Sequence, residues 1–361
     1  MQIALDATPL TVATGGVRRY TVELGLALAE REPLDTIWLL SDQTFERPTP
    51  APDNLRKGGG PRNALQRRWW SFGLQAELGR LHADVFHGTD FAVPYLPIRP
   101  TVMTIHDVSP WKDKRWHSQA DRIRQRTPML LRLGLATMVI TPSEAVRRET
   151  IDWFELSANR VVAVPLAASA QFRPVSPQPT ERPFFLYVGT LEPRKNLPRL
   201  LEAWRQLRQM HAIDLVLAGR QRPDAPAILP EPGLRLLGAV PDSQLPELYA
   251  SALACVYPSS YEGFGLPVLE AMQCGAAVLT SKDTALVELA GDGAMCIDAN
   301  DTQAWVEALS RAAEQPAWLA GLRREGTKRA SEFSWRRTAA LTREVYEEAI
   351  RRFRKRSVSF G

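Results

Sequence analysis

The sequence predicts an α/β protein made of two doubly wound domains, each a parallel sheet flanked by helices. The chain has 361 residues, more than one hydrophobic core usually supports. Short apolar segments alternate with helical patterns along almost the whole chain, which is typical of a parallel sheet covered by helices. The alternation stops at a proline-rich segment and then begins again, so the pattern predicts two domains joined by a linker.

The first domain is predicted to span residues 1–170. Its strands are expected at the apolar segments 2–5, 37–40, 84–86, 102–105, 138–141 and 161–164. Its helices are expected at residues 17–30, 63–81, 118–133 and 143–154. Apolar runs of four to eight residues between such helices are the length of buried strands.

The linker is predicted at residues 171–183, where prolines interrupt any helix or central strand. The second domain follows at residues 184–335. Its strands are expected at residues 184–188, 214–218, 234–237, 254–257, 277–280 and 294–297. Its helices are expected at residues 197–210, 243–250, 267–274, 285–290 and 302–314. A last amphipathic helix, residues 336–361, is predicted to pack back onto the first domain.

The composition is that of an ordinary soluble protein, with 45% hydrophobic and 24% charged residues. No apolar run approaches the roughly 20 residues that span a bilayer, and the first residues do not resemble a secretory signal. The three cysteines lack the spacing of metal ligands or of a disulfide framework. We therefore expect a cytoplasmic location.

The net charge of +5 is concentrated in two stretches, residues 56–80 and 112–132. One interpretation is that these are solvated helix faces. The other is that they contact anionic lipid headgroups, with Trp69 and Trp70 at the interface, so that the protein is peripheral on the inner face of the cytoplasmic membrane. Nucleic acid is not expected as a partner, because no recognised binding motif accompanies the charge.

Residues 258–272, Pro-Ser-Ser-Tyr-Glu-Gly-Phe-Gly-Leu-Pro-Val-Leu-Glu-Ala-Met, carry the most chemistry. A strand is predicted to end before this segment and a helix to begin near Leu266. The N–H groups of Gly265, Leu266 and Val268 at the start of that helix would face an anion. Glu262 lies in the loop, and Glu270 lies in the helix, where its carboxylate could accept hydrogen bonds from both ribose hydroxyls of a nucleotide.

This segment resembles the Glu-x7-Glu signature of the glycosyltransferase group 1 family, the family 4 of retaining GT-B enzymes. Three further segments resemble the family in the same order: Gly15-Gly16-Val17-Arg18-Arg19-Tyr20, Thr104-Ile105-His106-Asp107 and residues 185–196, Phe-Leu-Tyr-Val-Gly-Thr-Leu-Glu-Pro-Arg-Lys-Asn. The last of these is most similar to a bacterial mannosyltransferase-like branch. The resemblance covers about residues 3–350 and implies a GT-B fold, in which the two domains face a central cleft.

The resemblance also implies roles for individual residues. Arg194 and Lys195 would clamp the diphosphate, His106 would contact the donor sugar, and Glu262 would act in the same site. Thr190 stands where some relatives have an additional arginine, so the clamp would depend on Arg194 and Lys195. Thr190 is itself an expected donor contact, and the others are Gly15, Gly16, Gly219, Val240, Gly263, Phe264, Gly265, Leu266 and Glu270.

No metal or other cofactor is expected. The histidines do not cluster as zinc ligands, and no Asp-x-Asp follows a predicted strand. The charge that develops on a departing diphosphate could instead be stabilised by cationic side chains and helix N-termini.

The predicted function is transfer of a hexose, mannose from GDP-mannose, with retention, onto a glycan or lipid-linked acceptor in surface polysaccharide or O-antigen synthesis. Three alternatives stay open at this point. They are a UDP-sugar donor such as UDP-glucose or UDP-GlcNAc, a GT-B-fold NDP-sugar 2-epimerase, and a non-enzymatic protein that binds sugar nucleotides. The sequence does not specify the acceptor, the linkage or the oligomeric state.

Overall fold

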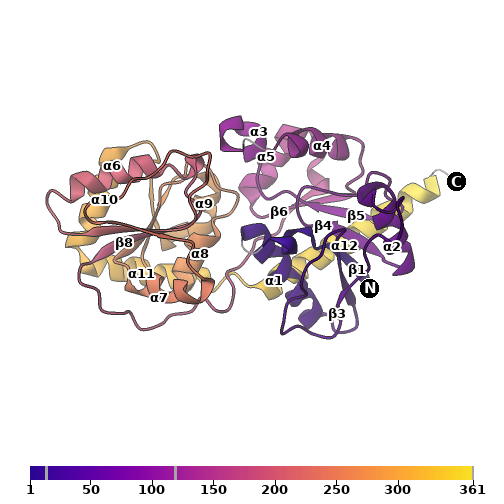
Figure 1. The fold of residues 1–361 in the computed structure, drawn as a ribbon, viewed down its shortest axis with the longest axis horizontal. Coiled ribbons are helices and arrows are strands. Elements are labelled where there is room, and N and C mark those ends of the chain that lie inside the picture. The colour runs from indigo at the N-terminus through magenta and orange to yellow at the C-terminus, as the bar shows by residue number, and fades with distance from the viewer. Residues whose placement is uncertain (13–14, 118–119, 360–361) are drawn as a thin grey trace. The chain divides into compact units, whose positions relative to one another are not determined.

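The computed structural model describes residues 1–12, 15–117 and 120–359, and the chain divides into two compact units (Figure 1). Unit 1 combines the described residues of Met1–Lys112, Gln119–Leu166 and Ser334–Gly361. Unit 2 combines those of Asp113–Ser118 and Ala167–Phe333. The sequence-based division gave residues 113–117 and 167–170 to the first domain, whereas they belong to unit 2. It also set residues 171–183 apart as a linker, which unit 2 includes, and it ended the second domain at residue 335 instead of 333.

Unit 1 contains a seven-stranded parallel sheet with the order β3-β2-β1-β4-β5-β6-β7. The strands are β1 (Gln2–Asp6), β2 (Thr36–Leu40), β3 (Leu55–Lys57), β4 (Val85–Gly88), β5 (Thr101–Thr104), β6 (Met138–Thr141) and β7 (Val161–Ala163). The strand order reverses between β1 and β4, and doubly wound sheets bind ligands beyond the carboxyl ends of their strands at such a point. The sequence missed β3, because two of its three residues are exposed and it forms no apolar run.

The helices of unit 1 are α1 (Gly16–Arg31), α2 (Leu74–Arg80), α3 (Ser109–Lys112), α4 (Asp121–Arg132), α5 (Glu144–Phe154) and α12 (Trp335–Ser359). The single helix predicted over residues 63–81 is wrong at its start, where turns lead into a π-helix, Trp69–Gly73, before α2. The predicted start of the helix at residues 118–133 and the predicted end of the helix at residues 336–361 cannot be compared, because residues 118–119 and 360–361 lie outside the described residues.

The prediction that both tryptophans face a lipid surface is wrong for Trp69. This side chain is 3% exposed and belongs to a core cluster with Leu74, Leu78 and Phe86, against which half-buried Trp70 also packs. Burial of such a large apolar surface stabilises the fold more than exposure at an interface would.

A buried chain of hydrogen bonds joins α12 to the sheet of unit 1. The Nδ1 atom of His87 lies 2.7 Å from the hydroxyl of Tyr346, and its Nε2 atom lies 2.7 Å from that of Thr104. The Thr104 hydroxyl also lies 2.9 Å from that of Tyr20 in α1. Burial, together with nearby His106, lowers the pKa of His87 to about 3, so the imidazole is neutral.

Unit 2 contains a six-stranded parallel sheet with the order β10-β9-β8-β11-β12-β13. The strands are β8 (Phe184–Val188), β9 (Asp214–Ala218), β10 (Leu234–Gly238), β11 (Ala254–Tyr257), β12 (Val278–Ser281) and β13 (Met295–Ile297). This sheet reverses its order between β8 and β11. Both units are thus doubly wound, as predicted.

The helices of unit 2 are α6 (Leu197–Leu207), α7 (Leu245–Ser251), α8 (Leu266–Gln273), α9 (Thr284–Ala290), α10 (Thr302–Glu314) and α11 (Pro316–Ala330). In Figure 1, α6 and α10 lie on one side of β8, while α7 and α11 lie on the other. The sequence did not predict α11, whose glycines and charges obscure the helical pattern. Tertiary packing explains it, because Gly326 lies against Met272 of α8.

Among the described residues, no helix combines the length and the apolar character needed to cross a bilayer.

Replacing Tyr346 by phenylalanine tests how α12 is held. We expect Tyr346→Phe to lower the free energy of unfolding by about 1–3 kcal/mol, because it leaves a ring nitrogen of buried His87 without its partner. Chemical denaturation measures this loss. Arg336→Gln, at an exposed position of the same helix, is the control and should unfold like the parent protein. Equal stability of the two variants would contradict a structural role for the hydrogen bond.

Candidate functional site

The loop after β8 brings Arg194 and Lys195 to the point where the strand order of unit 2 reverses. Both belong to a short 3-10 turn, Pro193–Lys195, which ends because Asn196 adopts a left-handed conformation with φ of 53°. The side-chain Nδ2 of Asn196 donates to the carbonyl oxygens of Pro258, at 3.2 Å, and Ala299, at 2.7 Å. The loop after β8 is therefore held against the loop after β11.

The loop after β11 carries Glu262 and leads into α8. Gly265 begins that helix with φ of +99°, and a Cβ atom there would lie 2.4 Å from Cδ2 of Leu286. Only glycine fits both the conformation and the space. Of the N–H groups predicted to be free, that of Val268 donates to the Gly265 carbonyl at 3.0 Å, so this part of the prediction is wrong.

Glu262 gathers the two cationic side chains. Its Oε1 atom lies 2.5 Å from Nζ of Lys195, and its Oε2 atom lies 3.1 Å from Nη1 of Arg194. The hydroxyl of Ser259 donates to Oε1 at 2.7 Å. Glu192 pairs with Nε of Arg194 at 2.7 Å, so the cluster alternates positive and negative side chains.

The cluster shifts the titration of its members. Burial alone would favour the neutral form of Glu262, but the charges of Lys195 and Arg194 outweigh it and lower the pKa of this carboxyl to about 2. Burial and the charge of Arg194 lower the pKa of Lys195, while Glu262 opposes that shift. Glu262 is therefore ionised at neutral pH and holds the cations in place.

Glu270 lies one turn into α8, as predicted, but it is only 1% exposed. The hydroxyl of Tyr249 in α7 donates to its Oε2 atom at 3.1 Å. Tyr249 thus orients the Glu270 carboxylate through this hydrogen bond. Sequence reasoning missed this residue, because a tyrosine in an amphipathic helix reads as part of the core.

The other expected donor contacts lie around the same edge of the unit 2 sheet. Gly219 follows β9, where a Cβ atom would lie 1.8 Å from the Gly189 carbonyl oxygen, so glycine is required for this close approach. Phe264 is buried and packs edge-on against Phe333. Thr190 is exposed, Gly263 is buried, and Leu266 and Val240 are half-buried.

Residues 113–117 also belong to this side of unit 2, which the sequence did not reveal. The ring of Trp116 stacks on that of Tyr261, with centroids 5.9 Å apart and planes at 17°. Nη1 of Arg222 donates to the Trp116 carbonyl at 2.5 Å and pairs with Oε2 of Glu192 at 3.0 Å. The only sequence signal was a basic stretch, which does not indicate contact with a distant tyrosine.

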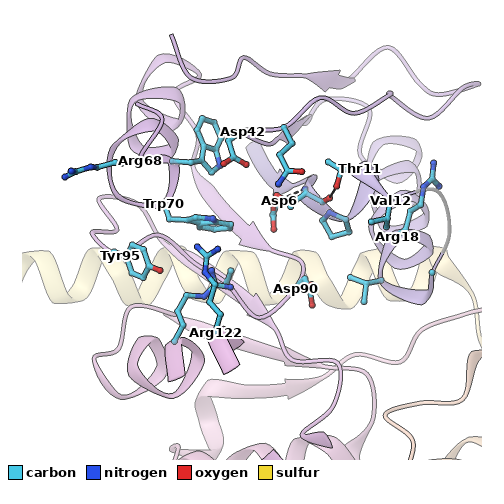
Figure 2. A pocket seen from close by; sticks show the side chains of 18 of the residues that line it. Asp6, Thr11, Val12, Arg18, Asp42, Arg68, Trp70, Asp90, Tyr95 and Arg122 are labelled. Carbon is cyan, nitrogen blue, oxygen red and sulfur yellow. Dashed lines mark hydrogen bonds between the residues drawn. The ribbon is translucent and has the colours of Figure 1, made fainter. Parts of the chain in front are cut away.

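Unit 1 has its own candidate site at the reversal between β1 and β4. A cavity of about 700 Å³ opens there, and its walls include Gly15, Gly16, Asp6 and Asp90 (Figure 2). Burial raises the pKa of Asp6 to about 6, against hydrogen bonds from Thr8. The sequence placed the glycines at this strand end but did not single out the two aspartates.

His106 follows β5 in unit 1, and its ring is held by a hydrogen bond to the backbone of Thr89 and by contact with aromatic rings. Its Nε2 atom lies 2.8 Å from the Thr89 carbonyl oxygen, which can only accept, so Nε2 carries the proton. The ring of Tyr20 meets it edge-on at 5.0 Å. Asp107 accepts from the backbone of Ser109 at 2.9 Å, so it caps the loop.

Within the part of the chain that the structure describes, no three His, Cys, Asp or Glu side chains are grouped to hold a metal ion.

Comparisons with known proteins agree with this arrangement. The model described as "Glycosyl transferases group 1" matches residues 169–332, and that described as "Glycosyltransferase Family 4" matches residues 14–172. O-antigen chain mannosyltransferase B of Escherichia coli is 32% identical, over 96% of this chain and 100% of that protein.

Two solved structures share the fold. Sucrose-phosphate synthase from Thermosynechococcus elongatus has a TM-score of 0.75 and 20% identity, covering 96% of this chain and 98% of the other. Anabaena Alr3699/HepE in complex with UDP-glucose has a TM-score of 0.69 and 18% identity, covering 96% and 99%. Two doubly wound domains of this kind make up the GT-B fold. The chain belongs to the glycosyltransferase group 1 family, the glycosyltransferases of family 4.

Lowering the pH should reduce the free energy of unfolding because Glu262 becomes protonated. Since its pKa falls from an ordinary 4.5 to about 2 in the folded state, its stabilising contribution is complete above pH 4.5 and is lost as the pH falls toward 2. The loss is on the order of 3 kcal/mol. We expect Glu262→Gln to flatten this part of the stability curve, measured by denaturation between pH 5 and pH 2.5. Glu202→Gln, at an exposed helix position, should keep the parent slope; a Glu262→Gln curve with that slope would refute the assignment.

Proposed function

We propose that the protein is a retaining mannosyltransferase that moves mannose from GDP-mannose onto a glycan or lipid-linked acceptor in O-antigen or related surface polysaccharide synthesis. The observation that carries the proposal is the meeting of Arg194 and Lys195 on one carboxylate, at the carboxyl end of the unit 2 sheet. The similarity to a mannosyltransferase of O-antigen chains supports the choice of sugar and pathway.

The cluster is suited to a diphosphate leaving group. A guanidinium binds phosphate oxygens in pairs, and an ammonium adds a point charge. Glu192 and Glu262 neutralise these cations and keep them oriented. An incoming diphosphate would take over part of that pairing, so the charge that develops on departure would meet donors already in position. This chemistry needs no metal ion on the protein.

The remaining residues have roles in the same proposal. Glu270, oriented by Tyr249, would accept hydrogen bonds from the ribose hydroxyls. The start of α8 at Gly265 and Leu266 would face the phosphates. His106 has Nε2 committed to the Thr89 carbonyl, so it would contact the donor sugar through its Nδ1 atom or ring edge.

A UDP-sugar is the alternative donor, because a solved structure of the same fold contains UDP-glucose. That likeness, at 18% identity, concerns the fold alone. The epimerase and the non-enzymatic binding protein are less well supported, since neither accounts for the similarity along the whole chain to a transferase.

We further propose a cytoplasmic location with peripheral contact at the membrane. Exposed apolar side chains, rather than the tryptophans, support this: Leu65, Leu96 and Ile98 of unit 1 are 59%, 59% and 58% exposed. Arg67 and Arg68 follow Leu65 closely in the sequence. Such a combination of apolar and basic residues favours anionic bilayers.

Substituting Lys195 tests the clamp. We expect Lys195→Ala to weaken nucleoside diphosphate binding and to lower turnover by at least about 100-fold, because a charge at the leaving group is lost. Calorimetry with GDP and a coupled assay for released GDP measure the two effects. Lys328→Ala, an exposed lysine in α11, is the matched control. Turnover near the parent value in Lys195→Ala would remove this residue from the clamp.

The donor is tested by thermal shift and product analysis. We expect GDP and GDP-mannose to raise the melting temperature more than UDP and UDP-glucose, and GDP to be released only when a membrane lipid extract supplies an acceptor. Nuclear magnetic resonance of the product should give an α-mannoside, the anomer of the donor. A shift with UDP alone would transfer the proposal to a UDP-sugar, and a changed sugar without acceptor would indicate epimerisation.

A further inference from the structure

The cavity of unit 1 has an uneven distribution of charge. Arginines contribute five of its lining side chains, Arg18, Arg67, Arg68, Arg122 and Arg126, whereas three acids line it, Asp6, Asp42 and Asp90. Burial raises the pKa of Asp6 to about 6 and also that of Asp90, although His106 and Arg126 favour the charged form of Asp90. Five arginines against three aspartates leave the lining of the cavity with an excess of positive charge.

Two of the arginines come from successive turns of one helix. Arg122 and Arg126 lie four residues apart in α4, so both project from the same face. Other cations in this part of unit 1 are neutralised, since Lys112 pairs with Glu149 at 2.5 Å and Arg124 with Asp121 at 2.5 Å. Among the described residues, neither Arg122 nor Arg126 forms an ion pair.

Arg126 is the more strongly fixed of the two. Its guanidinium lies 5.6 Å from the ring centre of Trp70, and its Nε atom is buried without a hydrogen-bond acceptor in the described part of the chain. A buried donor without an acceptor is destabilising unless a ligand supplies one. In Figure 2, Trp70, Tyr95 and Arg122 lie on one side of the cavity, and Asp90 and Val12 lie on the other.

The start of α1 adds further donors to the cavity. Gly15 and Gly16 line it, no side chain caps this helix, and its first turn contains no acid. A Cβ atom on either glycine would meet nothing within 4 Å, so the space beside these amides is open. Helix N-termini with free space favour anions.

We propose that this cavity binds the phosphate or diphosphate group of the acceptor, with Arg122 and Arg126 as its ligands and with Tyr95 and Trp70 as apolar walls for the attached sugar. The inference rests on the proposed function, because it assumes that unit 1 receives an acceptor. A free sugar phosphate and a lipid-linked glycosyl diphosphate share this chemistry. Asp6, Asp42 and Asp90 could accept hydrogen bonds from sugar hydroxyls in the same cavity.

Calorimetry with charged and neutral probes tests the proposal. The full chain carrying Arg194→Gln, Lys195→Gln and Glu262→Gln is used, so that the donor clamp does not take up a diphosphate and no buried carboxylate is left without its cations. We expect octyl mannosyl diphosphate to bind at least about 10-fold more tightly than octyl mannoside, with a preference that falls as salt rises. Equal affinity for the two probes would overturn the proposal.

Variants of α4 assign the effect to the cavity. Adding Arg122→Gln and Arg126→Gln should abolish the preference, whereas Arg132→Gln, at an exposed position of α4 outside the cavity, should preserve it. Arg122→Gln alone, at an exposed position, should reduce it and serves if the double variant does not fold. A preference that survives Arg122→Gln and Arg126→Gln would refute the proposal.

Two further experiments distinguish a free sugar phosphate from a lipid-linked diphosphate, and test the donor site separately from the cavity. Mannose 1-phosphate that binds through Arg122 and Arg126 as tightly as the octyl diphosphate would identify a free sugar phosphate as the ligand; weaker binding would identify the lipid-linked group, and either supports the cavity as an anion site. Thermal shifts with GDP and UDP on the protein with intact Arg194 and Lys195 report on the donor side. If neither GDP nor UDP raised the melting temperature, the proposed function would be contradicted, while the calorimetric result for the cavity would stay valid.

Discussion

The candidate donor site depends on the ionised carboxylate of Glu262. This side chain is largely buried, and it remains charged only because Lys195 and Arg194 lie against it. Removing any one of the three would leave an uncompensated charge in a poorly solvated place, which is why buried charges are normally found in pairs or clusters. The two loops that carry them are joined by Asn196, whose side chain bonds to backbone on the far side. Strand order, loop conformation and electrostatics thus all hold the cluster of Glu262, Lys195 and Arg194 together.

The two units use the same geometry for different chemistry. In each sheet the strand order reverses beside the first strand, and the loops that follow the neighbouring strands diverge. In unit 2 the space beyond this reversal is occupied by alternating cations and carboxylates. In unit 1 it is an open cavity of about 700 Å³ lined by five arginines and three aspartates. A closed, preorganised cluster suits a leaving group, and a roomy cavity suits a larger substrate.

The last helix links the end of the chain to the centre of unit 1. The chain returns to unit 1 at residue 334, and α12 packs there on α1 and on β4, β5 and β6. Its Tyr346 reaches neutral, buried His87, which in turn bonds Thr104 two residues before His106. The position of His106 is therefore supported by a residue near the opposite end of the sequence.

The sequence by itself determined the two doubly wound domains and most strands, because buried parallel strands are short apolar runs that periodicity reveals. It also predicted that Arg194, Lys195, Glu262 and Gly265 lie in loops between a strand and a helix, since local motifs carry this information. It could not identify β3, α11, Tyr249 or the membership of Trp116 in unit 2. Only the tertiary structure decided these, because an exposed edge strand, a helix held by packing, a hydrogen bond from a neighbouring helix and a ring stacked on a residue 145 positions away leave no periodic or local pattern. The uneven charge of the unit 1 cavity likewise arises only when distant segments fold together.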